Sequence, residues 1–442
     1  MGSENSFEYM EGDIDTNIVS LGNARIDSPV KGTMFIEDGE RTLIDTSLAF
    51  LEKCRLQGRY PSTFEIAGPR KKIFFDPSKT KAGIVTCGGL CPGINNVIRS
   101  IVMEFYYMYG VHNICGIPFG LQGFIPKYAH PIIDLTPQSV EHIQERGGTV
   151  LGSSRGGQDI SEIVDAIERL NLNILFFIGG DGTLKAASAV AKEVLARNYK
   201  CSVIGIPKTI DNDISFVSKT FGFDTAVKEA KKAIMCAHAE AKGAPNGIGL
   251  VKFMGRDSGF ITAYAALAQG DANFVLVPEM DFDLDGENGF LSCLEKRIKN
   301  RGHAVIVVAE GAGLKFFDSA NAKKDASGNI KMGDIGIFLK DAIQNFFARI
   351  DMPINLKYID PSYMIRSVEA DATDSIFCGL LAQMAVHAGM SGKTDMLIGN
   401  WGNNYVHIPI ALSVRERKKI DVKGPLWMSV MESTGQPVMK NS

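Results

Sequence analysis

The sequence predicts an α/β protein of doubly wound, three-layer architecture. From residue 81 onward, apolar runs rich in β-branched residues alternate with helical stretches, which is typical of parallel sheets covered by helices on both faces. Four of these runs end in loops rich in glycine and polar residues. Ligands of such sheets bind beyond the carboxyl ends of the strands, so these loops are the expected site.

Length and composition fit two or three globular domains and exclude several classes of function. The chain has 442 residues, of which 45% are apolar and 22% charged, and its net charge of −3 indicates no nucleic-acid partner. No apolar run approaches the roughly 18 residues of a membrane span, so we expect no membrane contact. The eight cysteines include no C-x-x-C pair and are interpreted as reduced thiols of a cytoplasmic protein.

The first 78 residues are polar and irregular and are predicted to form an N-terminal extension packed on the body of the protein. The sequence predicts one helix there, over 43–56, and a basic patch at 70–72. The opening residues are not a signal peptide, although Gly2 and Ser6 fit the short pattern for N-myristoylation. No chemistry is assigned to this extension.

The units of strand, glycine-rich loop and helix follow in order from residue 81. Strands are expected at 82–86, 174–178, 203–206, 247–253, 274–277, 303–309 and 395–398, and helices at 94–107, 184–197, 260–269, 334–349 and 371–388. Residues 317–333, rich in Asp, Lys, Asn and Gly, are expected to be an exposed insertion.

The loop 205–213 follows the third strand and carries the groups that phosphoryl transfer to an alcohol requires. Asp211 and Asp213 offer one carboxylate to take the alcohol proton and another to help hold or position a metal. Thr209 adds a hydroxyl, and the Lys208 ammonium can neutralise charge on the transferred group. The alternative is a polar turn with solvated aspartates, but a second loop of the same kind upstream favours chemistry.

That second loop, 179–183, reads Gly-Gly-Asp-Gly-Thr and lies between a buried strand and the start of a helix. Glycines allow close approach of a ligand, and a helix N-terminus attracts anions. Asp181 repels phosphate unless Mg²⁺ lies between them, so it is a candidate magnesium ligand; the alternative is a helix N-cap. Arg155 offers a bidentate phosphate donor, and the loop 88–93 is a further point of close approach.

Two other nucleotide-binding motifs receive no support. Gly392-Lys393-Thr394 resembles the end of a P-loop, but His387 occupies the place of the required first glycine. No Gly-x-Gly-x-x-Gly follows an early strand, so a dinucleotide site is not predicted.

Taken together, four loops resemble those of the 6-phosphofructokinase family. They are Gly-Gly-Leu-Cys-Pro-Gly-Ile-Asn (88–95), Gly-Gly-Asp-Gly-Thr (179–183), Pro-Lys-Thr-Ile-Asp-Asn-Asp (207–213) and Met-Gly-Arg-Asp-Ser-Gly (254–259). The segments 309–311 and 357–366 extend the resemblance, which covers most of the chain from about residue 70 to about residue 415. Within the family, the chain is most similar to the ATP-dependent trypanosome and plant-like branch, which is close to the pyrophosphate-dependent enzymes.

The resemblance implies phosphoryl transfer from Mg-ATP to the 1-hydroxyl of fructose 6-phosphate in glycolysis, with Mg²⁺ as cofactor. Asp211 matches the general base, and the catalytic loop also includes Lys208, Thr209 and Asp213. The matches to the ATP pocket are Gly89, Arg155, Gly180, Asp181, Gly182 and Thr183, with Asp181 on the metal. The matches to the fructose 6-phosphate pocket are Thr209, Asp211, Asp213, Met254, Gly255, Arg256, Glu310, Lys357, Tyr363 and Arg366.

The resemblance also implies two doubly wound (Rossmann-like), three-layer domains with the active site in the cleft between them, and it implies their boundaries and assembly. The larger, ATP-binding domain is expected at 79–222 plus 365–415, and the smaller, fructose 6-phosphate-binding domain at 223–364 plus 416–442. A homodimer or homotetramer in the cytoplasm is expected.

The chain departs from common bacterial ATP enzymes at three positions of the sugar-phosphate pocket. Gly247 stands where those enzymes have an arginine donated by a neighbouring subunit, Tyr363 replaces a histidine, and Lys357 replaces another arginine. Arg99 matches one arginine of the bacterial effector site, but a second falls on Met103, so no regulation is inferred.

Two positions mark the choice of phosphoryl donor, and they disagree. Pyrophosphate enzymes carry an aspartate where this chain has Gly182, which leaves room for ATP, whereas Lys208 is typical of pyrophosphate enzymes. An aspartate at position 182 would exclude ATP by its volume and charge, and this effect is harder to evade than the presence of a cation at position 208. ATP is therefore predicted as the phosphoryl donor, and pyrophosphate is the alternative. NAD or lipid kinases share 179–183 but have no reason to hold Asp211 together with Arg366, and an inactive regulatory subunit is expected to have lost Asp211 or Asp181.

Overall fold

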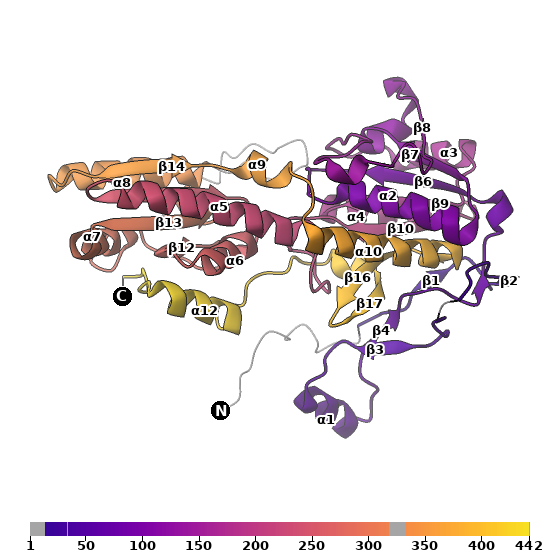
Figure 1. The fold of residues 1–442 in the computed structure, drawn as a ribbon. Coiled ribbons are helices and arrows are strands. Elements are labelled where there is room, and N and C mark those ends of the chain that lie inside the picture. Colours follow the sequence, from indigo (N-terminus) through magenta and orange to yellow (C-terminus); the bar gives the residue numbers. More distant parts are fainter. Residues whose placement is uncertain (1–13, 33, 318–332, 442) are drawn as a thin grey trace.

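The structure, a computed structural model, describes residues 14–32, 34–317 and 333–441. Two main sheets, each covered by helices, lie end to end in the molecule (Figure 1). The predicted fold class is thereby confirmed. The proposed N-myristoylation site, Gly2 with Ser6, and nearly all of the expected insertion at 317–333 lie outside the described residues.

The larger sheet has nine strands, and its five central strands are parallel. In spatial order the strands are β3 (Arg41–Leu43), β4 (Thr63–Ile66), β17 (Asn404–Pro409), β16 (Met396–Trp401), β10 (Ser202–Pro207), β9 (Ile174–Gly179), β6 (Lys81–Thr86), β7 (Asn113–Ile117) and β8 (Ile133–Asp134). The outer strands β3, β4, β17 and β8 run antiparallel to their neighbours. This arrangement places the ends of β6, β9 and β10 side by side in the middle of the sheet.

Helices cover both faces of the larger sheet, and its central strand β9 is apolar at every position. On β9, Ile174, Phe176 and Ile178 pack in the core beneath α2 (Ile94–Glu104) and α10 (Ala372–Met390). Leu175 and Phe177 face the opposite core, beneath α3 (Ile160–Arg169) and α4 (Asp181–Ala196). Side chains alternate between the faces of a strand, so a fully apolar strand is stable only between two helical layers.

The smaller sheet has four parallel strands in the order β12 (Phe274–Leu276), β13 (His303–Ala309), β11 (Gly247–Phe253) and β14 (Asn355–Ile359). The helices α5 (Phe223–Lys242) and α6 (Phe260–Gln269) pack together on one face, and α7 (Phe290–Arg301) and α8 (Ile335–Arg349) on the other. The remaining elements are short helices and edge pairs: α9 (Ser362–Arg366), α11 (Ile410–Ser413), α12 (Pro425–Thr434), β1 (Val19–Ser20) with β15 (Lys393–Thr394), β2 (Ile26–Asp27) with β5 (Lys72–Ile73), and five 3₁₀ turns at 77–79, 120–124, 126–128, 143–145 and 314–316.

Several predicted boundaries move in the structure. The helix expected over 43–56 is α1 (Leu48–Leu56), because the Ser47 side chain caps it and Arg41–Leu43 form strand β3 instead. The helix expected over 94–107 is α-helical only to Glu104 and continues as a π-helical turn. The helix expected from 184 begins at 181, so the second glycine-rich loop runs into its first turn.

The predicted basic patch at 70–72 is wrong, because each of its cations is paired with a carboxylate. Lys71 and Lys72 form ion pairs with Glu37 and Asp27, and Arg70 is buried beside Glu65 and 3.4 Å from Asp38.

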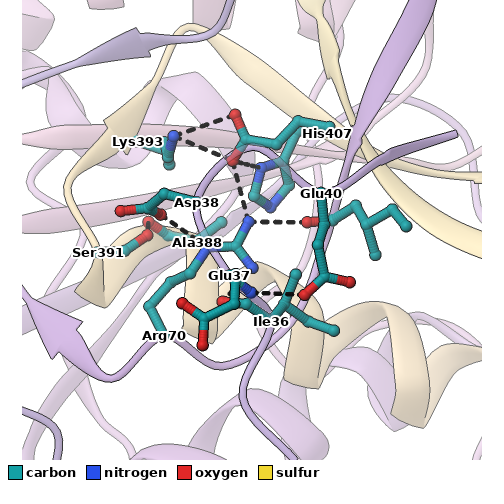
Figure 2. A network of polar contacts seen from close by, with 11 residues as sticks. Ile36, Glu37, Asp38, Glu40, Arg70, Ala388, Ser391, Lys393 and His407 are labelled. Atoms are coloured by element: carbon teal, nitrogen blue, oxygen red, sulfur yellow. Dashed lines mark hydrogen bonds and ion pairs between the residues drawn. The ribbon is translucent and has the colours of Figure 1, made fainter.

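Glu65 is the centre of this buried network, and Figure 2 shows its partners Arg70, Lys393 and His407. Arg70 Nη2, Lys393 Nζ and His407 Nδ1 each lie 3.0 Å from its Oε1 atom. Burial alone raises the pKa of Glu65, but His407 and Lys393 reverse the effect and lower it below its ordinary value. The network ties β4 and the loop at 36–40 to β17 and β15, so part of the N-terminal extension is built into the edge of the larger sheet.

Among the described residues, no helix is both long and apolar enough to cross a membrane. All eight cysteines are free thiols, as the sequence predicts.

Candidate functional site

A cavity of about 510 Å³ opens where the loops after β6, β9 and β10 meet the loop after β11. Twelve of the predicted site residues line it: Gly89, Arg155, Gly180, Asp181, Gly182, Thr183, Lys208, Thr209, Asp211, Asp213, Met254 and Arg366. These residues are spread over 278 positions of the sequence, from 89 to 366, and the carboxyl ends of the strands bring them together.

Three cationic side chains converge on the glycine loop after β6. A Cβ atom on Gly89 would lie 3.6 Å from a guanidinium nitrogen of both Arg155 and Arg366, and one on Gly88 would lie 3.5 Å from Lys208 Nζ. Arg366 also stacks 4.7 Å from the ring centroid of Tyr363, and its Nε is buried without a hydrogen-bond partner in the described part of the chain. This wall of the cavity is therefore suited to a polyanion.

Lys208 is the buried member of this cationic wall. Its Nζ donates a hydrogen bond of 2.5 Å to the Gly89 carbonyl, which joins the loop after β10 to the loop after β6. Burial lowers the pKa of Lys208, and the neighbouring Arg155 and Arg366 lower it further. An anion bound at this wall would offset the positive charge of the three side chains.

The start of α4 forms the floor beside this wall. Its N-cap is Gly180, which has no side chain to accept hydrogen bonds from the first N–H groups of the helix, so these remain available to an anion. Asp181 is the first helical residue and not the N-cap, which removes the structural alternative for it. No heavy atom of the described residues lies within 4 Å of a Cβ placed on Gly182, so this position faces open space in the cavity.

The loop after β10 holds two carboxylates in different environments. Asp213 is buried and accepts hydrogen bonds from Thr209 Oγ1 at 3.0 Å and from Arg417 Nη1 at 2.5 Å. In Asp211, by contrast, the Oδ1 atom is buried but has no hydrogen-bond partner among the residues described. Thr209 Oγ1 also accepts the Asp211 backbone N–H, which fixes the turn.

The environment of Asp211 favours its protonated form. Burial raises its pKa well above the usual value, and the charges of Asp213, Glu310 and Asp257 raise it further, whereas Arg417 lowers it. A buried carboxylate with a raised pKa and a free oxygen in a cavity is the arrangement expected of a general base.

The smaller sheet contributes less to the cavity than the sequence predicts. Met254 lines the cavity, but Gly255, Arg256, Glu310 and Lys357 do not. Glu310 follows β13, and Gly255 and Arg256 follow β11. Lys357 is exposed on β14 opposite Gly249, and Tyr363 lines an adjoining hollow with Arg155 and Arg366. The assignments of these residues to a sugar phosphate stay predictions.

Gly247, where bacterial ATP enzymes carry an arginine, has a structural reason to lack a side chain. A Cβ on this residue would lie 2.0 Å from the carbonyl oxygen of Ala241 at the end of α5. Close packing of α5 on the first residue of β11 therefore excludes an arginine here in this conformation.

Sequence reasoning missed three charged residues of the site. Lys185 donates to Asp181 at 2.9 Å, while Asp257 and Arg417 form an ion pair of 3.2 Å beside Asp213. Lys185 lies one helical turn after Asp181, a spacing that indicates such a pair. Arg417 lies in the basic run 415–419, far from any glycine-rich loop, and no local pattern points to it.

The site fits a divalent cation held mainly by its substrate. No group of three or more His, Cys, Asp or Glu side chains able to hold a metal occurs among the described residues. Asp181, in the cavity beside the open position at Gly182, offers one partly exposed carboxylate. This is the donor set that Mg²⁺ uses when phosphate oxygens and water supply its other ligands.

Fold and site together define a two-domain α/β protein with a polyanion cavity that has a cationic wall and an unpaired buried carboxylate. Residues 81–389 match the sequence profile of the family described as Phosphofructokinase. The chain belongs to the phosphofructokinase family, which confirms the resemblance.

Curated relatives cover most of the chain. It is similar to the ATP-dependent 6-phosphofructokinase of Borreliella burgdorferi, at 54% identity over 384 residues, which span 85% of this chain and 86% of the relative. It is also similar to the ATP-dependent 6-phosphofructokinase of Amycolatopsis methanolica, at 44% identity over 437 residues, which span 96% of this chain and 95% of that one. The crystal structure of a pyrophosphate-dependent phosphofructokinase from Marinobacter aquaeolei has a TM-score of 0.65 at 18% identity, covers 82% of this chain and 92% of that chain, and shows the shared fold.

Proposed function

We propose that the chain transfers the terminal phosphoryl group of ATP to the 1-hydroxyl of fructose 6-phosphate, giving fructose 1,6-bisphosphate and ADP. The observation that carries this proposal is the buried, unpaired Asp211 Oδ1 in the same cavity as the cationic wall. The two relatives named above are both called ATP-dependent 6-phosphofructokinases, which supports the choice of acceptor and donor.

In this reaction Asp211 is the general base. Its Oδ1 takes the proton of the sugar hydroxyl as the hydroxyl oxygen bonds to the γ-phosphorus, and the bond from that phosphorus to the β-phosphate bridge breaks. The raised pKa of Asp211 suits this role, since a base accepts a proton more readily as its pKa approaches the working pH. Thr209 and Asp213 hold the loop that carries Asp211.

The cationic wall binds the phosphates of the donor. Lys208 and Arg155, with the N–H groups at the start of α4, face its β- and γ-phosphates, and Arg366 faces the sugar phosphate in the adjoining hollow. Asp181 would hold Mg²⁺, which when bound neutralises charge on the phosphate oxygens. Met254, Gly255, Arg256, Glu310, Lys357 and Tyr363 are proposed for the acceptor side.

ATP is the proposed donor because of the open space at Gly182. An aspartate at this position would extend into the cavity beside Asp181 and oppose the α-phosphate of ATP. Lys208 is compatible with either donor, since its ammonium can contact the terminal phosphates of ATP or free pyrophosphate.

We further propose the domain division predicted from the sequence and a cytoplasmic homodimer or homotetramer. The large sheet draws its strands from residues 41–207 and 396–409 and the small sheet from 247–359, which supports the division. Free thiols at all eight cysteines support a reducing compartment.

The test is fructose 1,6-bisphosphate formation by the purified chain with Mg²⁺ and fructose 6-phosphate, with ATP and pyrophosphate compared as donors. Turnover with ATP supports the proposal, and turnover with pyrophosphate alone would overturn the donor assignment. Asp211→Asn serves as the matched control, because it keeps the shape of the side chain and removes the base.

A further inference from the structure

The chain returns from the larger to the smaller sheet through residues 416–420, here called the return segment, which connects β17 and α11 to α12 (Figure 1). This segment lies beyond residues 81–389, which match the family profile. It runs along the loop that carries Asp211. The Lys418 N–H donates to the Asp213 carbonyl at 2.9 Å, and Ser215 Oγ donates to the Glu416 carbonyl at 2.8 Å.

Lys418 attaches the return segment to the far side of the same loop. Its Nζ donates to Asn212 Oδ1 at 3.1 Å and to the carbonyls of Val217 and Ser218 at 2.8 and 3.1 Å. Asn212 has a left-handed backbone with φ of 55°, so the loop turns sharply between Asp211 and Asp213. Through these hydrogen bonds Lys418 stabilises the sharp turn, and it places its neighbour, Arg417, at the cavity.

Arg417 extends its guanidinium among three carboxylates from three different loops. Nη1 lies 2.5 Å from Asp213 Oδ2 and 3.2 Å from Asp257 Oδ2, and Nη2 lies 3.9 Å from Asp181 Oδ2. Asp181 and Asp213 follow β9 and β10 of the larger sheet, whereas Asp257 follows β11 of the smaller one. The Arg417 side chain is 33% exposed and lines the cavity, so it faces the reactants as well as the protein.

We propose that Arg417 is a positioning residue for the phosphoryl transfer. It orients the Asp213 carboxylate, links the loop after β11 to the loop after β10, and offsets the negative charge that surrounds Asp211. This inference rests on the proposed function and adds to it a residue that acts through Asp213 and Asp211.

The charges around Asp211 explain why a cation is required there. Asp213, Glu310 and Asp257 face it from the ends of β10, β13 and β11, and Arg417 is the cation that opposes them. Cys91, in the loop after β6, is buried close enough for the Asp211 charge to raise its thiol pKa. Without Arg417, three acidic groups would hold Asp211 protonated to higher pH, and less of the base form would exist near neutrality.

The experiment compares the pH dependence of kcat/KM for fructose 6-phosphate in the wild type, Arg417→Met, Arg417→Lys and Asp257→Asn. Arg417→Met should move the acid limb upward by about one pH unit and lower kcat near neutrality about tenfold. Arg417→Lys keeps the charge, so its pH profile should be closer to that of the wild type than the profile of Arg417→Met, although lysine loses the simultaneous contacts of the guanidinium with Asp213 and Asp257. Asp257→Asn removes a negative charge near Asp211 and should move the acid limb in the opposite direction.

Arg415→Met is the matched control, because Arg415 is exposed in the same basic run, and its profile should equal that of the wild type. Circular dichroism and thermal melting of each variant check folding, and Arg417→Lys with Asp257→Asn decide the matter if Arg417→Met does not fold. An acid limb unmoved in Arg417→Met and in Asp257→Asn, with any loss uniform across pH, would overturn the inference and leave the proposed function intact. No turnover by the wild type would overturn the proposed function and, with it, the inference.

Discussion

Replacing Gly182 with aspartate should remove the ability of the chain to use ATP while leaving the fold intact. The position has a helical backbone in the first turn of α4, and an added side chain meets no described heavy atom within 4 Å of its Cβ. Replacing a helical glycine with aspartate gains about 0.3 kcal/mol in helix propensity, and an acidic residue near a helix N-terminus contributes about 0.3–1 kcal/mol more. The variant should therefore be at least as stable as the wild type, apart from repulsion by Asp181.

The loss of ATP use follows from the charge of the new side chain. A carboxylate about 5 Å from a phosphate charge, at an effective dielectric constant of about 20, raises the energy of the complex by about 3 kcal/mol. This corresponds to a decrease of roughly 100-fold in kcat/KM for ATP. Initial rates at saturating fructose 6-phosphate and varied ATP measure this decrease.

Two matched variants separate the charge from the volume of the side chain. Gly182→Asn has nearly the same shape without the charge, and Gly182→Ala adds a single methyl group. We expect a modest decrease for asparagine and a small one for alanine. Unchanged ATP kinetics in Gly182→Asp, with normal melting, would refute the reasoning; an equal loss in asparagine and aspartate would assign the effect to volume alone.

Four further predictions concern other residues. Asp211→Asn should lower kcat by about 10²–10⁴ but raise the melting temperature at neutral pH. A carboxyl whose pKa is raised by folding destabilises the folded state as pH rises from the unfolded-state pKa through the folded-state pKa, and asparagine removes this cost. Equal melting temperatures of the two proteins at pH 7 would contradict this. Arg70→Met leaves the buried Glu65 short of a partner and should cost about 3–5 kcal/mol in urea unfolding. Contacts in the folded state lower the pKa of Glu65, so the contribution of this residue to wild-type stability should be lost as pH falls below the ordinary pKa of a glutamate. Chemical unfolding at several pH values measures this loss. Gly247→Arg should reduce soluble yield and stability, because its Cβ would collide with the Ala241 carbonyl, and a wild-type melting curve would refute that.

The fold class and the centre of the site could be predicted because their signals are local. A run such as Ile174–Gly179 is apolar at every position, which indicates a strand buried on both faces. The glycines at 88–89 and 179–182 mark close approach of a ligand, and the strand ends bring those loops together whatever lies between them. For this reason, twelve of the predicted residues line one cavity.

The edge of the larger sheet could not be predicted because its pairing depends on distant residues. Strand β4 pairs with β17, where Ile66 lies opposite Val406, 340 positions later in the chain. Arg70 likewise stands in a run of three cations that looks exposed, and only the buried Glu65 shows otherwise. The place of Lys357 outside the cavity depends in turn on the register of β14 against β11, which no sequence pattern sets.

The cavity separates its charges, and this separation has a consequence for the reaction. Lys208, Arg155 and Arg366 gather at the loop after β6, whereas Asp211 and Asp213 stand at the loop after β10. A polyphosphate is stabilised at the first wall and repelled from the second, so the phosphates of an extended donor are expected to lie against the cationic wall.

Asp181 and Arg417 stand between these two walls, 3.9 Å apart. Asp181 would hold a cation that accompanies the donor, while the shorter contacts of the Arg417 guanidinium are those to Asp213 and Asp257. Because Asp213 belongs to the loop that carries Asp211, the charge beside the base depends on these two contacts of Arg417.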